Sequence, residues 1–179
     1  MKKNIYSMAA LLIIAVPAFT VIQSQNWKIS EDYSIKFTGK NASGIFKGFK
    51  GTISFDETNL AASKFDVSID VSTINTGSGM KNTHAKSEKW FDAGKYPTIS
   101  FTSSFITKTS TGYEAKGRLT MHGVTKDFII PFPFTKNGNG GAFASGFEIN
   151  RIDFNMQTPE PDLDAATIFK VDLNIPVHK

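Results

Sequence analysis

The chain has no cysteine, and this absence excludes several kinds of stabilisation and chemistry. Without cysteine there can be no disulfide bond, no thiolate nucleophile and no thiolate zinc site, so packing alone must hold the fold together. Histidine is also scarce, with three copies scattered along the chain. No carboxylate lies at a metal-ligand spacing from any of them, and we therefore expect no metal site.

Motifs that carry known catalytic chemistry are missing as well. The sequence contains no nucleophile elbow, phosphate-binding loop, dinucleotide fingerprint or zinc-protease helix. We therefore predict a protein that is not an enzyme, with no catalytic residue and no cofactor. A catalytic alternative based on His84 and Glu88 would require these two groups to converge in a pocket.

The formal net charge of +4 is partly a property of the first residues. Lys2 and Lys3 precede an apolar run over residues 8–16, the order typical of a secretory signal peptide. We predict that this leader spans residues 1–24, with cleavage after a residue from Ala18 to Ser24, and that one domain spans residues 25–179. Cleavage would remove two positive charges, and what remains is no footprint for nucleic acid.

The predicted leader also sets the expected location. A membrane span needs about 20 apolar residues, and the unbroken run here is shorter. An uncleaved membrane anchor is the alternative. We expect a periplasmic or secreted protein with no stable membrane span after processing.

Alternating apolar and polar residues predict about eight half-buried strands. These strands are expected near residues 33–38, 44–55, 64–71, 97–105, 113–122, 124–134, 143–149 and 169–177. Short turns join most of them and no helical crossover separates them, which favours antiparallel pairing. Gly48 and Gly51 predict a bend in the second strand, and Pro131 and Pro133 predict an edge or distortion. The pattern indicates an all-β fold, an eight-stranded antiparallel barrel with a polar exterior.

One segment departs from this pattern. Met80, His84, Ser87 and Phe91 are spaced to share one face of a short helix, which predicts a helical insertion near residues 80–91. We expect residues 82–90, here called the lid segment, to cover an open end of the barrel. In the alternative, Trp90 is an ordinary core residue.

Four motifs in order resemble the YceI-like family of secreted bacterial proteins. They are Trp27-Lys-Ile-x4-Ser34-Ile-Lys-Phe37, His84-x-Lys-Ser87-x2-Trp-Phe91-Asp92-x3-Tyr-Pro97-x-Ile-x-Phe101-x-Ser, Gly117-Arg-Leu-Thr-Met-His-Gly-Val-Thr125 and Asn150-Arg-Ile-Asp-Phe154. The resemblance covers nearly the whole predicted domain. It implies a lipocalin-like barrel that binds a long isoprenoid lipid, such as a polyprenyl phosphate or a quinone tail.

On this resemblance, the inward apolar residues and the lid segment form the candidate lipid-binding set. The set is Phe37, Phe55, Val67, Ile69, His84, Trp90, Phe91, Ile99, Phe101, Leu119, Phe128, Ile130, Phe147, Phe169 and Val171. The alternative is that these side chains simply fill the barrel, which would then act as a structural or protein-interaction module. His84 is expected either to fix the local backbone or to contact a head group. Arg151 is expected to close a barrel end, stacked on an aromatic ring such as that of Trp27.

Overall fold

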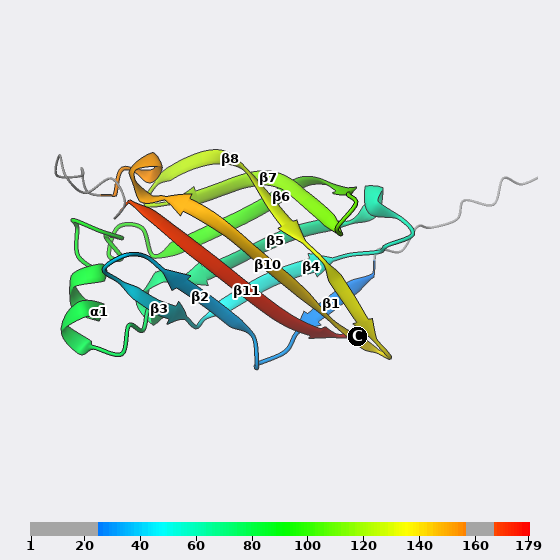
Figure 1. The fold of residues 1–179 in the computed structure, drawn as a ribbon, viewed down its shortest axis with the longest axis horizontal. Coiled ribbons are helices and arrows are strands. Elements are labelled where there is room, and N and C mark those ends of the chain that lie inside the picture. The colour runs from blue at the N-terminus through cyan, green and yellow to red at the C-terminus, as the bar shows by residue number, and fades with distance from the viewer. Residues whose placement is uncertain (1–24, 157–166) are drawn as a thin grey trace, which may run out of the picture.

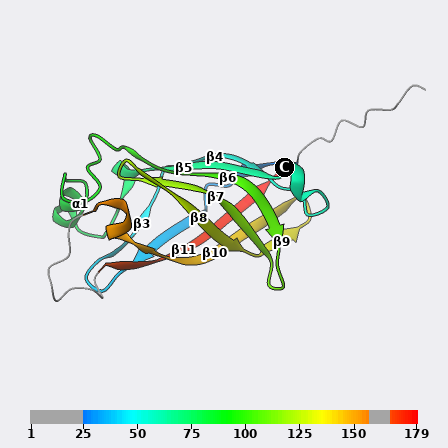
Figure 2. The same cartoon turned by 90° about the horizontal axis from the view of Figure 1, so that it is seen from above.

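The computed structural model describes residues 25–156 and 167–179, so the predicted signal peptide lies outside the described residues. These residues form one curled antiparallel sheet with a short helix at one end (Figures 1 and 2). The strands are β1 (Asn26–Ile29), β2 (Ser34–Thr38), β3 (Ser43–Phe46), β4 (Phe49–Ser54), β5 (Lys64–Asp70), β6 (Thr98–Lys108), β7 (Tyr113–Met121), β8 (Val124–Phe132), β9 (Phe134–Asn137), β10 (Gly140–Asn150) and β11 (Ile168–His178). The helices are α1 (Gly79–Ala85) and three 3-10 turns, η1 (Leu60–Ala62), η2 (Val71–Thr73) and η3 (Arg151–Phe154).

The sheet is antiparallel throughout its described pairings, as predicted, but it does not close into the expected eight-stranded barrel. The strand order is β3-β2-β11-β1-β4-β5-β6-β7-β8, with β10 paired to β11 and β9. Among the described residues no ladder joins β8 to β10. Pro131 and Pro133 explain the gap, because neither has a backbone N–H to donate to a ladder. Only isolated hydrogen bonds cross this gap. Ser145 Oγ donates to the carbonyl of Pro131 at 2.6 Å, and the amide of Ala144 donates to the carbonyl of Pro133 at 3.3 Å.

The strand count rises from eight to eleven for local reasons. Gly48 has a φ of 76°, which favours glycine, and this bend divides the predicted second strand into β3 and β4. Pro133 separates β8 from β9 in the same way. The third addition is β1, which contributes four residues beside β4 and β11.

The helical insertion is present but shorter than predicted. Ser78 caps α1 by accepting a hydrogen bond from the amide of Lys81, and the helix ends at Ala85 rather than near residue 91. Beyond it the amide of Ser87 donates to the carbonyl of His84, and that of Trp90 to the carbonyl of Ser87. These bonds span three residues, so the chain continues as tight turns and not as α-helix.

The interior is filled at the end remote from α1. Seven aromatic side chains pack there and are called the aromatic plug: Trp27, Phe55, Phe65, Tyr113, Phe132, Phe134 and Phe143. Phe55 lies at its centre, 1% exposed, with ring centroids 5.0–6.2 Å from those of five other members. Edge-to-face packing of this kind stabilises a core beyond the area that it buries.

Candidate functional site

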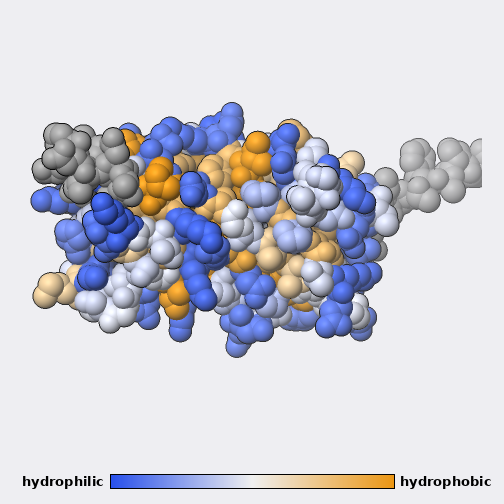
Figure 3. Space-filling view, viewed as in Figure 1, coloured by the Kyte–Doolittle hydropathy of each residue, from blue (hydrophilic) through white to orange (hydrophobic). Residues whose placement is uncertain are grey.

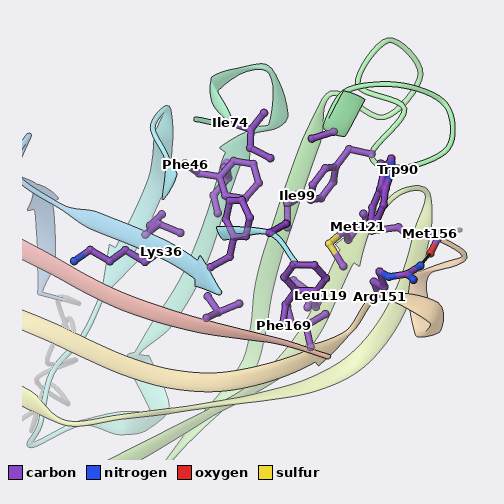
Figure 4. A pocket seen from close by; sticks show the side chains of 18 of the residues that line it. Lys36, Phe46, Ile74, Trp90, Ile99, Leu119, Met121, Arg151, Met156 and Phe169 are labelled. Carbon is purple, nitrogen blue, oxygen red and sulfur yellow. Dashed lines mark hydrogen bonds between the residues drawn. The ribbon is translucent and has the colours of Figure 1, made fainter. Parts of the chain in front are cut away.

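A cavity of about 370 Å³ occupies the half of the molecule next to α1. Its wall is almost entirely apolar. Strands that face each other across the interior of the curled sheet contribute to it (Figure 4). Figure 4 also shows the amine of Lys36 pointing away from the other labelled side chains, although Lys36 borders the cavity. The volume falls in the range typical of sites for small apolar ligands.

Strand periodicity explains most of the wall. On each strand every second side chain faces inward, so Val67 and Ile69 from β5 lie beside Phe101 and Ile99 from β6 in register. Leu119 continues this row on β7, opposite Phe101. The outward neighbours are polar, and Figure 3 shows a largely hydrophilic face with apolar atoms visible between polar side chains.

Thirteen of the fifteen candidate residues border this cavity. They are Phe37, Val67, Ile69, His84, Trp90, Phe91, Ile99, Phe101, Leu119, Ile130, Phe147, Phe169 and Val171. Phe55 does not, because it lies in the aromatic plug. Phe128 packs its ring against that of Phe147 at 5.3 Å and also stays off the wall. Contact between these side chains and a lipid remains a prediction.

The cavity wall also includes residues outside the candidate lipid-binding set. They are chiefly Ile35, Phe46, Phe49, Ile74, Met121, Ile149, Met156 and Leu173. Four of these, Ile35, Met121, Ile149 and Leu173, share the inward parity of selected neighbours and could have been found from it. Phe46 precedes the Gly48 bend, and Ile74 and Met156 lie outside strands, where no period of two applies.

The lid segment covers the α1 end of the cavity. Trp90 and Phe91 both border the cavity, and the ring of Phe91 packs edge-on against Phe46 at 5.7 Å. Trp90 Nε1 donates a hydrogen bond to Nε2 of His84 at 2.7 Å. His84 therefore orients an aromatic side chain of the lid segment.

Arg151 lies over the ring of Trp90. Its guanidinium lies 5.0 Å from the centre of the Trp90 ring, and its Nη1 donates to the carbonyl of Met156 at 2.7 Å. The side chain is buried, and desolvation lowers the pKa of Arg151 from its ordinary value. The expected stacking of an arginine at a barrel end is present, but Trp27 was the wrong partner: Lys179 lies over Trp27 instead.

The two residues of the catalytic alternative lie apart. His84 accepts from Trp90, whereas Glu88 is exposed and does not border the cavity, so the two do not converge there. Within residues 25–156 and 167–179, no group of histidine and carboxylate side chains is placed to hold a metal ion. No helix in that part of the chain is long and apolar enough to cross a membrane.

Comparison with known proteins places this fold and cavity in context. The model of the YceI-like domain family matches residues 22–178. UPF0312 protein YE1254 of Yersinia enterocolitica is 34% identical over 80% of this chain and 79% of its own length. Protein YceI of Salmonella arizonae is 31% identical over 88% of this chain and 89% of its own.

Solved structures are similar in fold. Crystalline BcnA from Burkholderia cenocepacia superimposes with a TM-score of 0.78 at 27% identity, covering 83% of this chain and 99% of BcnA. A polyisoprenoid binding domain from Saccharophagus degradans gives a TM-score of 0.61 at 15% identity, covering 87% of this chain and 99% of that domain. At that identity the second likeness concerns the fold alone.

Proposed function

Because the chain belongs to the YceI-like domain family, we propose that it is a carrier that holds the tail of an isoprenoid-type lipid in its cavity. The observation that carries this proposal is the cavity itself, about 370 Å³ with an almost wholly apolar wall. An apolar space of this size, between a filled core and a lid segment, suits a flexible hydrocarbon chain. The name of the Saccharophagus degradans domain supports a lipid of the polyisoprenoid class.

The energetics are adequate for reversible binding. Each CH₂ group removed from water contributes about 0.8 kcal/mol, so ten to twelve buried carbons give roughly 8–10 kcal/mol gross. Loss of translational freedom and ordering of the tail reduce this figure. A micromolar dissociation constant corresponds to about 8 kcal/mol net. Micromolar or weaker binding by the tail alone is therefore expected, and head-group contacts would add to it.

The polar groups of the cavity wall indicate which end of the lipid faces inward. Five of them, Asn41, Thr76, Lys81, His84 and Arg151, belong to turns, α1 and η3, which all lie at the same end of the sheet. The other three, Lys36, Ser68 and Ser100, lie on strands. The tail would point towards the aromatic plug, and the phosphate or quinone head group would lie near α1. A head group there could contact His84 or Lys81.

The carrier is proposed to act outside the cytoplasm, as the predicted leader at residues 1–24 suggests. It would need no catalytic residue and no cofactor, because sequestering a lipid requires only a dry cavity and a means of entry. Its partners would then be the lipid and whatever membrane or protein supplies it.

Co-purification tests the proposal. The full chain would be produced in a bacterium with its leader, purified without detergent and extracted for lipid mass spectrometry. We expect about one lipid per chain for the wild type. Val67→Phe, which adds a ring to the cavity wall, should lose the lipid without melting earlier, because it fills a hollow. Absence of lipid from the wild type, together with no binding of added prenyl phosphates, would favour a structural or protein-interaction module instead.

A further inference from the structure

The cavity ends abruptly inside the sheet. Going away from α1 along the inward face, the next side chain after Val67 on β5 is Phe65, and the next after Ile130 on β8 is Phe132. On β10 the inward residues after Phe147 are Ser145 and Phe143. Phe65, Phe132 and Phe143 are not part of the cavity wall, so the hollow stops at this level.

These three phenylalanines are the members of the aromatic plug that lie next to the cavity. They meet in the middle of the interior and are called the floor. Their ring centroids lie 5.2 Å apart for Phe65 and Phe132, 5.5 Å for Phe65 and Phe143, and 5.7 Å for Phe132 and Phe143. Phe55 packs against all three from the plug side, with centroids 5.3–6.2 Å away. Phe55 therefore supports the floor on the side away from the cavity.

Small residues occupy the inward positions of neighbouring strands at the level of the floor. At this level β6 has Ser103, β7 has Gly117 and β10 has Ser145. A Cβ added to Gly117 would lie 2.2 Å from the carbonyl oxygen of Thr102, so no larger residue fits there without moving the backbone. Ser103 is 4% exposed and accepts a hydrogen bond from the amide of Phe65 at 2.8 Å. The inward positions of β6, β7 and β10 at this level thus carry almost no side chain.

We propose that the floor limits the length of hydrocarbon chain that the protein can bury to roughly a dozen carbons. A chain carbon with its hydrogens needs about the space of one water molecule, roughly 30 Å³. A cavity of about 370 Å³ therefore holds a single chain of that length. The ligand class is an amphiphile with one tail of about ten to fifteen carbons, or the first such stretch of a longer tail whose remainder stays outside.

This inference rests on the proposed carrier function, and the two are separable by a chain-length series. Straight-chain alkyl phosphates of eight to twenty carbons would be titrated, below their micelle-forming concentrations, to displace an environment-sensitive fluorescent dye from the cavity. For the wild type, affinity should rise roughly fourfold per added CH₂ up to about twelve carbons and then level off. In Phe65→Ala, loss of the ring should extend the cavity and move this levelling point to chains longer by roughly three to five carbons.

Phe134→Ala is the matched control, because it removes the same ring from the plug. Phe134 contacts Trp27, Phe55 and Phe143 but does not border the cavity. Phe134→Ala should lower the free energy of unfolding without moving the levelling point. If Phe65→Ala does not fold, Phe65→Leu should give a smaller shift in the same direction.

Each outcome has a defined meaning. A levelling point that moves in Phe65→Ala and not in Phe134→Ala supports the length limit. Affinity that rises through twenty carbons in the wild type, or a levelling point that is the same in all variants, overturns the limit and leaves lipid carriage intact. A protein that binds neither the dye nor an alkyl phosphate of any length overturns the carrier function itself.

Discussion

Trp90 and His84 are joined by a hydrogen bond from the indole Nε1 to the imidazole Nε2 over 2.7 Å. In this bond Nε2 of His84 is the acceptor, and the bond is one of the contacts that hold Trp90 in place. Arg151 lies 5.0 Å from the centre of the same indole ring. Trp90 thus contacts both α1, through His84, and η3, through Arg151.

Loss of the acceptor at His84 should loosen the lid segment. His84→Phe removes the hydrogen bond, which contributes about 1 kcal/mol, and should speed release of a fluorescent polyprenyl analogue roughly fivefold. His84→Gln keeps an acceptor and should release the lipid at a rate closer to that of the wild type. Glu88→Gln is the control on the same segment, because Glu88 is exposed and off the cavity wall. Equal rates for all four proteins would show that the bond does not hold the segment.

Trp90→Ala should have a larger effect on release than on folding. It removes the contacts with both His84 and Arg151, and we expect release to accelerate about tenfold or more. The denaturant midpoint of the lipid-free protein should change little, since the lid segment is joined to the sheet by few backbone bonds. Truncation of a true core tryptophan instead costs about 3–5 kcal/mol. A large fall in the midpoint with unchanged release would show that Trp90 is ordinary core.

Phe101→Asp should be severely destabilising. Phe101 is 4% exposed on the inward face of β6, where an unpaired carboxylate would lose its hydration without gaining a partner. We expect a loss of several kcal/mol in the free energy of unfolding, measured by urea denaturation. Ser104→Asp places the same charge on an exposed position of β6 and should cost little. Wild-type stability of Phe101→Asp would contradict the inward orientation of Phe101.

Stability should also fall at high pH because of Tyr113. Burial first, and then its hydrogen bond to Glu57 at 3.0 Å, raises the pKa of Tyr113 above the ordinary value of 10.0. The folded protein therefore keeps this proton where the unfolded chain loses it. The contribution is complete below pH 10 and disappears as pH rises through the folded-state pKa. Tyr113→Phe should show a shallower alkaline loss of unfolding free energy; an identical slope would exclude Tyr113 as its source.

The alternation of residues predicts much of this fold because a strand with one buried face has a period of two. Val67 and Ile69 illustrate the case, since neighbours on β5 alternate inward and outward as expected. The same rule could not predict the gap between β8 and β10. Closure of the barrel depends on whether two edge strands that are distant in sequence pair with each other. Pro131 indicates only that its own strand lacks one backbone N–H donor.

The division of the interior was also beyond the sequence pattern. Phe55 and Phe101 have the same character in the sequence, inward and apolar, yet one is packed in the plug and the other borders the cavity. What separates them is the volume of their neighbours across the interior. Phe55 meets the rings of Phe65 and Phe132, and such contact between distant strands has no local signature.

The position of the lipid tail can be measured directly, because the chain has two tryptophans at opposite ends of the interior. Trp90 borders the cavity, whereas Trp27 packs in the aromatic plug against Phe134. Trp27→Phe and Trp90→Phe each leave a single fluorescent reporter. Both variants would be titrated with a prenyl phosphate that carries bromine on the first isoprene unit of its tail, next to the head group, where it quenches by contact. We predict saturable quenching of Trp90 at one lipid per chain and no quenching of Trp27; equal quenching of both, or of neither, would contradict a tail held in this cavity.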